Sequence, residues 1–177
     1  MPEKINTPEQ RDRRAELMVR FFDLAEHIGP LEGRSIEGAF GNEEGRRQLI
    51  ESLSEEEFFE LINGTNGILR DKEKDEWRID GERVKLTGFI GEHTPPRQED
   101  KVELLKKAFE EAKAMNQSGR SLEDIALLVS ASINEVHPYA DANGRTSRLI
   151  YTLLTKGYSE ESKAEIKNVL GEYGRDV

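Results

Sequence analysis

The sequence predicts an all-α domain with a single β-hairpin, and three observations lead to this fold class. Apolar residues recur at helical spacing through most of the chain, as Leu17 and Phe21 do near its start. Strand character is confined to residues 77–90, where Asp80-Gly81 favours a tight hairpin turn. The 177 residues suit one domain with a core of its own, and they contain no internal repeat and no linker.

Capping patterns set the limits of the helices in the first half of the chain. Thr7 and Gln10 form a capping box at the start of the first helix, and Ser54 opens another helix with three glutamates behind it. Asn63-Gly64 has the composition of a helix stop, so this later helix is expected to end there. The elements expected in order are a helix from Thr7 to the stop at Gly29-Pro30, a loop over 31–42, a helix over 43–52 and a helix over 54–62.

The central helix of the fold is expected to begin at Ser121 and to deliver His137 at its C-terminal end. Its residues are apolar all round, which indicates a helix that is buried on most sides. Pro138 disfavours continuation of the helix beyond His137. The other helices expected in this half cover 98–116, about 143–157 and about 159–170.

Composition and charge exclude several classes of partner. The chain has 36 acidic and 26 basic residues and a net charge of −10, which repels phosphate backbones, so no nucleic-acid partner is expected. It has no cysteine, which excludes disulfides and thiolate chemistry and fits a reducing cytosol. No apolar run approaches the roughly 18 residues of a membrane span, and the first residues lack the apolar stretch of a signal peptide. We therefore expect no membrane partner, and a location in the cytoplasm or secretion as an effector by a leaderless route.

The junction between the central helix and its successor, residues 137–148, concentrates groups that hold phosphates. Free N–H groups at a helix start attract anions, and the small residues at 142–144 would let a phosphate approach the backbone closely. Arg145 and Arg148 lie three residues apart, so both guanidinium groups would extend from one face of the new helix. This combination predicts a site for a small phosphate ligand.

An aspartate and a histidine of the same junction would act on such a ligand. Asp141 precedes the turn, and one carboxylate with phosphate oxygens and waters is a common way to hold Mg²⁺. His137 is a candidate general base for a hydroxyl nucleophile. Each residue also has an ordinary structural interpretation: a helix C-cap for the histidine, an N-cap for the aspartate and a solvated face for the arginines. The buried helix before the junction and the amphipathic helix after it favour the chemical interpretation.

Residues 137–148 resemble the signature of the Fic (Fic/Doc) family, His-Pro-Phe-x-Asp/Glu-Gly-Asn-Gly-Arg followed by an arginine three residues on. In that family a β-hairpin flap precedes the motif, and residues 77–90 followed by Thr94-Pro95-Pro96 are similar. The likeness covers about 77–158, whereas the first 70 residues share only general helical character. The resemblance implies one Fic domain over 1–177, with N-terminal helices over 1–70, the flap and Fic core over 71–158 and a C-terminal helix over 159–177.

Most Fic proteins are adenylyltransferases that move AMP from ATP to a protein hydroxyl and release pyrophosphate. For this chain the resemblance implies a Ser, Thr or Tyr target, with ATP as substrate and Mg²⁺ as cofactor. His137 would take the hydroxyl proton, and Asp141 would hold Mg²⁺. The implied phosphate-binding residues are Ala142, Asn143, Gly144, Arg145 and Arg148. The implied flap residues, which would pair with the target as an added strand, are Val84, Lys85, Leu86, Thr87 and Gly88.

Two positions depart from the signature. Tyr139 replaces phenylalanine, so its hydroxyl needs a partner, and Ala142 replaces a glycine although alanine is less suited to positive φ. Asp-Ala-Asn also occurs in Doc-like kinases that phosphorylate their target, but those carry lysine in place of Gly144, which favours adenylylation here. The alternatives are another nucleotide donor, a phosphotransferase, removal of AMP from a modified protein, and a module that binds nucleotide without turnover. Pure binding would not require His137.

Many Fic proteins are inhibited by a helix that carries Ser/Thr-x-x-x-Glu-Gly/Asn. Ser52 and Glu56 have this spacing, but Glu57 replaces the final Gly/Asn. The acidic first turn of a helix accounts for these glutamates through the helix dipole. We therefore expect no built-in inhibitory helix of the usual pattern, and regulation, if any, by a separate antitoxin-like chain.

Overall fold

The structure is a computed structural model that describes residues 8–27, 36–81, 86–88 and 91–170. Helices dominate these residues, which confirms the all-α class. Among them no helix has both the length and the apolar character that crossing a membrane requires. In chain order the elements are α1 (Pro8–His27), α2 (Ile36–Phe40), α3 (Glu43–Ser52), α4 (Glu55–Leu69), the 3₁₀ turn η2 (Lys74–Glu76), β1 (Leu86–Gly88), β2 (Gly91–His93), α5 (Gln98–Gln117), α6 (Leu122–Val136), α7 (Asn143–Lys156) and α8 (Glu160–Leu170).

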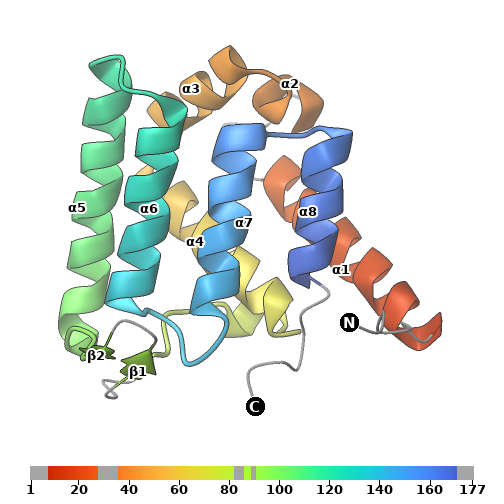
Figure 1. The fold of residues 1–177 in the computed structure, drawn as a ribbon, viewed down its shortest axis with the longest axis horizontal. Helices are drawn as coiled ribbons and strands as arrows, with labels where there is room; N and C mark the ends of the chain where they lie inside the picture. The colour runs from red at the N-terminus through yellow and green to blue at the C-terminus, as the bar shows by residue number, and fades with distance from the viewer. Residues whose placement is uncertain (1–7, 28–35, 82–85, 89–90, 171–177) are drawn as a thin grey trace.

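The long helices pack in two layers (Figure 1). Helices α5, α6, α7 and α8 lie side by side in chain order, and α4 and α1 pack behind them. Helix α6 is central, as predicted, and its Ile125 and Ile133 are fully buried. Burial of α6 is less complete than expected, since Leu127 is 60% exposed on its outer side. The connection between α6 and α7 lies at the end of the layer that also carries β1 and β2.

Local capping works where the sequence places it. The Ser54 hydroxyl accepts a hydrogen bond from the Glu57 N–H at 3.2 Å, and the Glu57 carboxylate accepts one from the Ser54 N–H at 2.7 Å. The Ser121 hydroxyl accepts a bond from the Asp124 N–H at 3.1 Å and so caps α6. Such bonds satisfy N–H groups that a helix start leaves without partners. The predicted starts of α4 and α6 are therefore confirmed.

The predicted stop of α4 at Asn63-Gly64 is wrong, because the helix continues to Leu69. A Cβ added to Gly64 would lie 2.6 Å from the Leu24 side chain, and one added to Gly67 would overlap the Trp77 indole. These glycines therefore bring α4 close to its neighbours and do not end it. Tertiary packing outweighs their low helix propensity.

A short helix also lies inside the loop predicted over 31–42. Helix α2 brings Ala39 and Phe40 into the core, where each is 1% exposed. The Phe40 carbonyl accepts hydrogen bonds from the Tyr158 N–H and the Arg46 guanidinium, both at 3.0 Å. Burial of Phe40 therefore orders a segment whose glycine content suggested a loop.

The hairpin predicted over 77–90 is not confirmed in that position. The described strands β1 and β2 pair antiparallel, with Leu86 opposite His93, so they only partly overlap the predicted range. Asp80 and Gly81 are not their turn, because both N–H groups donate to the Pro138 carbonyl, at 3.1 and 2.7 Å. Of the predicted flap, 84–85 lie outside the described residues, and 86–88 form β1.

Candidate active site

Helix α6 ends at a histidine in an unusual backbone conformation. His137 has φ 49° and ψ 59°, the left-handed region that a side chain with a Cβ rarely adopts. Its N–H still donates to the Ile133 carbonyl at 3.0 Å, so it closes the last turn of α6 as a C-cap. The chain leaves the helix axis at this point, and Pro138 cannot continue the helix.

Helix α7 begins with a second left-handed residue. Ala142, at its N-cap, has φ 62° and ψ 17°, and it has no side-chain acceptor for the N–H groups of the first turn. The next residue but one, Gly144, is exposed, and a Cβ added there would meet no atom of the described residues within 4 Å. The positive end of the α7 dipole is thus open to an anion that approaches from solvent.

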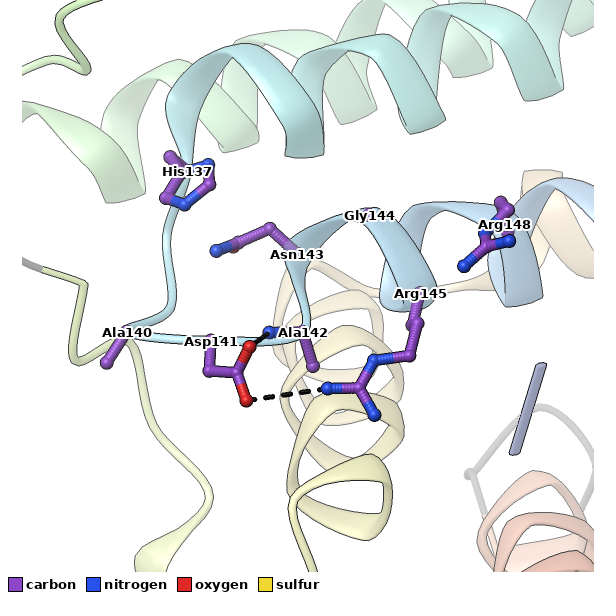
Figure 2. A pocket seen from close by; sticks show the side chains of 8 residues that line it. All are labelled: His137, Ala140, Asp141, Ala142, Asn143, Gly144, Arg145 and Arg148. Carbon is purple, nitrogen blue, oxygen red and sulfur yellow. Dashed lines mark hydrogen bonds and ion pairs between the residues drawn. The ribbon is translucent and has the colours of Figure 1, made fainter. Parts of the chain in front are cut away.

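The ends of α6 and α7 enclose a cavity of about 300 Å³ (Figure 2). Each motif residue to which the sequence assigns a role lines it, so the structure brings the whole predicted set together. The lining residues are His137, Ala140, Asp141, Ala142, Asn143, Gly144, Arg145 and Arg148. Both arginines border the cavity, as their spacing predicts, but Arg145 is buried and Arg148 is exposed.

Asp141 and Arg145 face each other across the mouth of the α7 turn. The Arg145 Nη2 lies 3.4 Å from Asp141 Oδ2, and the other carboxylate oxygen accepts the Ala142 N–H (Figure 2). The Asp141 side chain is 54% exposed, whereas that of Arg145 is 5% exposed. The carboxylate is therefore accessible to a cation from the cavity side, and Arg145 holds it at the helix start.

A single accessible carboxylate fits one type of divalent cation site. Among the described residues no group of three or more His, Cys, Asp or Glu side chains is placed to hold a metal. Mg²⁺ commonly binds through one or two carboxylates together with substrate phosphates and waters. Asp141 fits that arrangement, in which most oxygen ligands come from substrate phosphates and waters.

The Asn143 side chain closes the loop from within. It is 3% exposed, its Oδ1 accepts the Tyr139 N–H at 3.0 Å, and its Nδ2 donates to the Tyr139 carbonyl at 2.7 Å. Both polar atoms of the amide are engaged with the backbone of a single residue, Tyr139. Asn143 therefore fixes the shape of the loop that lines the cavity.

Asp80 holds the loop from the segment that follows α4. Its Oδ1 accepts the Ala140 N–H at 3.0 Å and the Arg70 guanidinium at 2.8 Å, and its Oδ2 accepts the Lys72 ammonium at 3.2 Å. Burial alone would raise the pKa of Asp80, but the hydrogen bonds from Arg70, Ala140 and Lys72 lower it to about 2. The ionised carboxylate thus ties the loop to two cations.

Side chains of α4 complete the attachment of the loop. Asn66 donates to the Asp141 carbonyl at 2.9 Å and to the Thr146 hydroxyl at 3.1 Å. The Tyr139 hydroxyl, which the sequence left in need of a partner, donates to Asn63 Oδ1 at 2.9 Å. Tyr139 itself is fully buried. Asn63, part of the predicted helix stop, therefore anchors the loop that lines the cavity.

One further cation, Lys101 of α5, reaches the junction. Its ammonium donates to the Gly81 carbonyl at 2.8 Å and to the His137 carbonyl at 2.7 Å, and the residue is fully buried. Sequence reasoning missed it, although one signal was present. Lys101 precedes Leu105 by one helical turn and Ala108 by two, so a lysine occupies the apolar stripe of α5.

The surroundings of His137 favour a neutral ring. Burial lowers its pKa below the ordinary 6.5, a hydrogen bond with the Asn134 backbone raises it, and the charges of Lys101 and His93 lower it further. The charge of Asp141 raises it. The net shift is downward, so at neutral pH the ring is in the form that accepts a proton.

Comparison with known proteins agrees with this arrangement. No solved structure matches the chain. Residues 46–155, which run from α3 to the last turn of α7 and include the whole cavity, match the Fic/DOC family. The protein therefore belongs to the Fic/DOC family, whose members generally transfer nucleotide- or phosphate-containing groups.

Proposed function

We propose that this protein transfers AMP from ATP to a Ser, Thr or Tyr hydroxyl of a target protein and releases pyrophosphate. One observation carries the proposal: the ring of His137 and the open N-terminal turn of α7 line the same cavity. A proton acceptor beside an anion site is the arrangement that transfer of a phosphoryl-type group requires. A site for binding alone would not need the base.

The proposed reaction assigns each group a task. Neutral His137 accepts the proton of the target hydroxyl, whose oxygen forms a bond to the α-phosphorus of ATP. The bond from that phosphorus to the oxygen bridging the α- and β-phosphates breaks, and pyrophosphate leaves with both electrons. The α7 N-terminus, Arg145 and Arg148 bind the phosphate oxygens. Asp141 would hold Mg²⁺, which supplies neutralisation of the phosphate charge.

Ala142 favours one second candidate, transfer of the γ-phosphate, because Asp-Ala-Asn also occurs in Doc-like kinases. The left-handed backbone of Ala142 shows that alanine takes up the turn conformation in which the family usually has glycine. Gly144 supports AMP transfer, since its open surroundings leave room beside the α7 turn that a lysine would fill. We propose AMP transfer as the main activity.

The proposed partner is a protein segment that presents the hydroxyl. Residues 84–88 would pair with it as an added strand, and β1 and β2 provide the short ladder to which it would add. A separate antitoxin-like chain is the proposed inhibitor. Both proposals rest on membership of the family alone, because the Fic/DOC match itself identifies no partner.

Two parallel labelling experiments test the reaction. The protein is incubated with Mg²⁺ and cell lysate, and with ATP labelled at either the α- or the γ-phosphate. Label from the α-position alone should be retained on protein, and mass spectrometry should find an added AMP. Retention from the γ-position alone would instead establish phosphorylation.

His137→Ala should abolish this transfer while ATP affinity is retained. General base catalysis typically contributes about 10²- to 10⁴-fold in rate, so the rate of the variant should be at least about 100-fold below that of wild type. Transfer is measured with α-labelled ATP, and ATP affinity by calorimetry on the same preparation. Equal rates for variant and wild type would show that another group accepts the proton.

A further inference from the structure

Lys101 is a buried ammonium group bonded to two backbone carbonyls. The residue is fully buried, and its Nζ lies 2.8 Å from the Gly81 oxygen and 2.7 Å from the His137 oxygen. Burial of a lysine is costly, and the usual compensation is a carboxylate in contact. Here the hydrogen-bond acceptors are peptide oxygens, and Asp80 supplies a favourable charge nearby.

The His137 carbonyl is a specific target for this cation. It belongs to the residue that ends α6, where carbonyl groups lack intrahelical partners and the helix dipole is negative. A donor with full positive charge stabilises that end most strongly when both are removed from water. Lys101 therefore supplies a hydrogen-bond donor to the His137 carbonyl oxygen at the end of α6.

The same bond is made to a residue in a strained backbone conformation. A left-handed residue with a Cβ is strained relative to an ordinary one, so it persists only where its surroundings fix it. His137 is held on one side by its N–H bond to Ile133 and on the other by the bond from Lys101 to its carbonyl. This backbone conformation sets the direction of the Cα–Cβ bond, from which the imidazole ring extends.

Gly81 connects this contact to the rest of the loop. Its carbonyl accepts the second bond from Lys101, while its N–H donates to Pro138. A Cβ on Gly81 would lie 2.5 Å from the His137 oxygen, so the two backbones are in direct contact. Lys101 thus connects two backbone segments, at Gly81 and at His137, that are in contact with each other.

We propose that Lys101 is a positioning residue, which fixes His137 in its left-handed conformation so that the ring meets the target hydroxyl at the phosphate cavity. The role in transfer rests on the proposed function, whereas the conformational role does not. Lys101 acts through the His137 peptide and has no assigned contact with substrate.

Lys101→Met is the main test, because methionine keeps an unbranched chain of similar length and removes the donors. The kcat for AMP transfer should fall on the order of 100-fold, as expected from a misplaced base, while KM for ATP changes less than about threefold. Lys101→Arg, which retains donors and charge, should recover part of the loss. Lys107→Met is the matched control, because Lys107 lies on the same helix with its side chain 66% exposed.

The conformation of His137 is measured independently by NMR on the full-length protein. Three-bond couplings and Cα shifts should report a positive φ for His137 in wild type and a shift toward negative φ in Lys101→Met. The pH profile of AMP transfer gives a second measurement. Because the Lys101 charge lowers the pKa of His137, its loss should move the acidic limb of that profile to higher pH. His93 and Asp141 are the remaining charged or titratable neighbours of the ring.

Each outcome bears on one of the two claims. If wild type transfers no AMP, the proposed function fails, and the couplings still test the contact between Lys101 and His137. An unchanged kcat in a folded Lys101→Met variant, or equal loss in Lys107→Met, overturns the positioning role. If Lys101→Met does not fold, wild type alone decides: a negative φ at His137, or ammonium protons of Lys101 that exchange freely with water, refutes the proposal.

Discussion

Two helix connections of this protein, α5–α6 and α6–α7, are built in opposite ways. The α5–α6 connection, residues 118–121, is exposed throughout and depends mainly on bonds within a few residues of sequence. The Ser118 N–H donates to the Ala114 carbonyl and the Arg120 N–H to that of Met115, both at 3.0 Å, and the Ser121 hydroxyl caps α6. Its positive φ, 74°, falls on Gly119, where it costs little.

The α6–α7 connection, residues 137–142, depends on contacts that are distant in sequence. Its positive φ values fall on His137 and Ala142, which both carry a Cβ. Its peptide groups are bonded to Asp80 and Gly81, to Asn66 of α4 and to Lys101 of α5. The comparison shows where strain is stored: the connection that carries the cavity is held in a costly conformation by its surroundings.

The largest expected effect comes from a methyl group placed against the α6–α7 connection. Gly81→Ala would place a Cβ 2.5 Å from the His137 oxygen and 2.8 Å from the Pro138 carbonyl carbon, so one backbone must move. We expect a loss of about 2–3 kcal/mol in the free energy of unfolding and a fall in AMP transfer. Urea unfolding and the labelled-ATP assay measure the two effects.

Gly119→Ala is the counterpart on the α5–α6 side. A Cβ there meets no atom of the described residues within 4 Å, so only the positive φ is penalised, at about 1 kcal/mol, and transfer should be unchanged. Equal losses of stability in the two variants would mean that the α6–α7 connection is no more constrained than the exposed one.

The same contrast explains how much of the molecule was predictable. Ser121 and Ser54 identified helix starts because an N-cap is a local device that a few residues encode. The cavity residues were predictable because a single continuous segment, 137–148, supplies them. The attachment of that segment was not, since Asn66, Asp80 and Lys101 come from three distant elements and acquire their roles only in the folded chain.

Errors in the predicted elements have the same origin. Asn63-Gly64 and Asp80-Gly81 are both favoured in turns by local propensity, and both instead make close tertiary contacts. Asp80-Gly81 binds the Pro138 carbonyl, which no local pattern could reveal. At these two dipeptides local rules therefore fail beside the 137–142 connection, where tertiary contacts outweigh local propensity.

Asp80→Asn tests the electrostatic part of this attachment and should cost about 2 kcal/mol. The folded-state pKa of Asp80 is depressed from 3.8 to about 2, and one unit corresponds to about 1.4 kcal/mol. A depressed carboxyl pKa stabilises the folded state above pH 3.8, and this contribution disappears as pH falls toward 2. The stability difference between wild type and variant should therefore be full at pH 6 and nearly absent at pH 2.

Asp124→Asn provides the comparison at the α5–α6 end. Asp124 pairs with Arg120 at 3.4 Å on the surface, with its side chain 45% exposed, so the change should stay within about 0.5 kcal/mol at either pH. Unfolding by guanidinium at both pH values measures each variant against wild type. A cost for Asp80→Asn that does not vary with pH would show that hydrogen-bond geometry, and not ionisation, holds the loop.

The smallest expected effect concerns the hydroxyl of Tyr139, which stands where the family signature has phenylalanine. Its bond to Asn63 Oδ1, at 2.9 Å, is neutral, and Asn63 is only partly buried, so water can replace the lost donor. Tyr139→Phe should therefore cost about 1 kcal/mol or less and leave AMP transfer within about twofold. Thermal unfolding of Tyr139→Phe, Asn63→Ala and the double variant isolates the pair, whose coupling should be about 0.5–1 kcal/mol. A much larger loss of transfer would mean that this hydroxyl, like Lys101, governs the position of the catalytic loop, whereas its expected small effect assigns that task to the charged contacts.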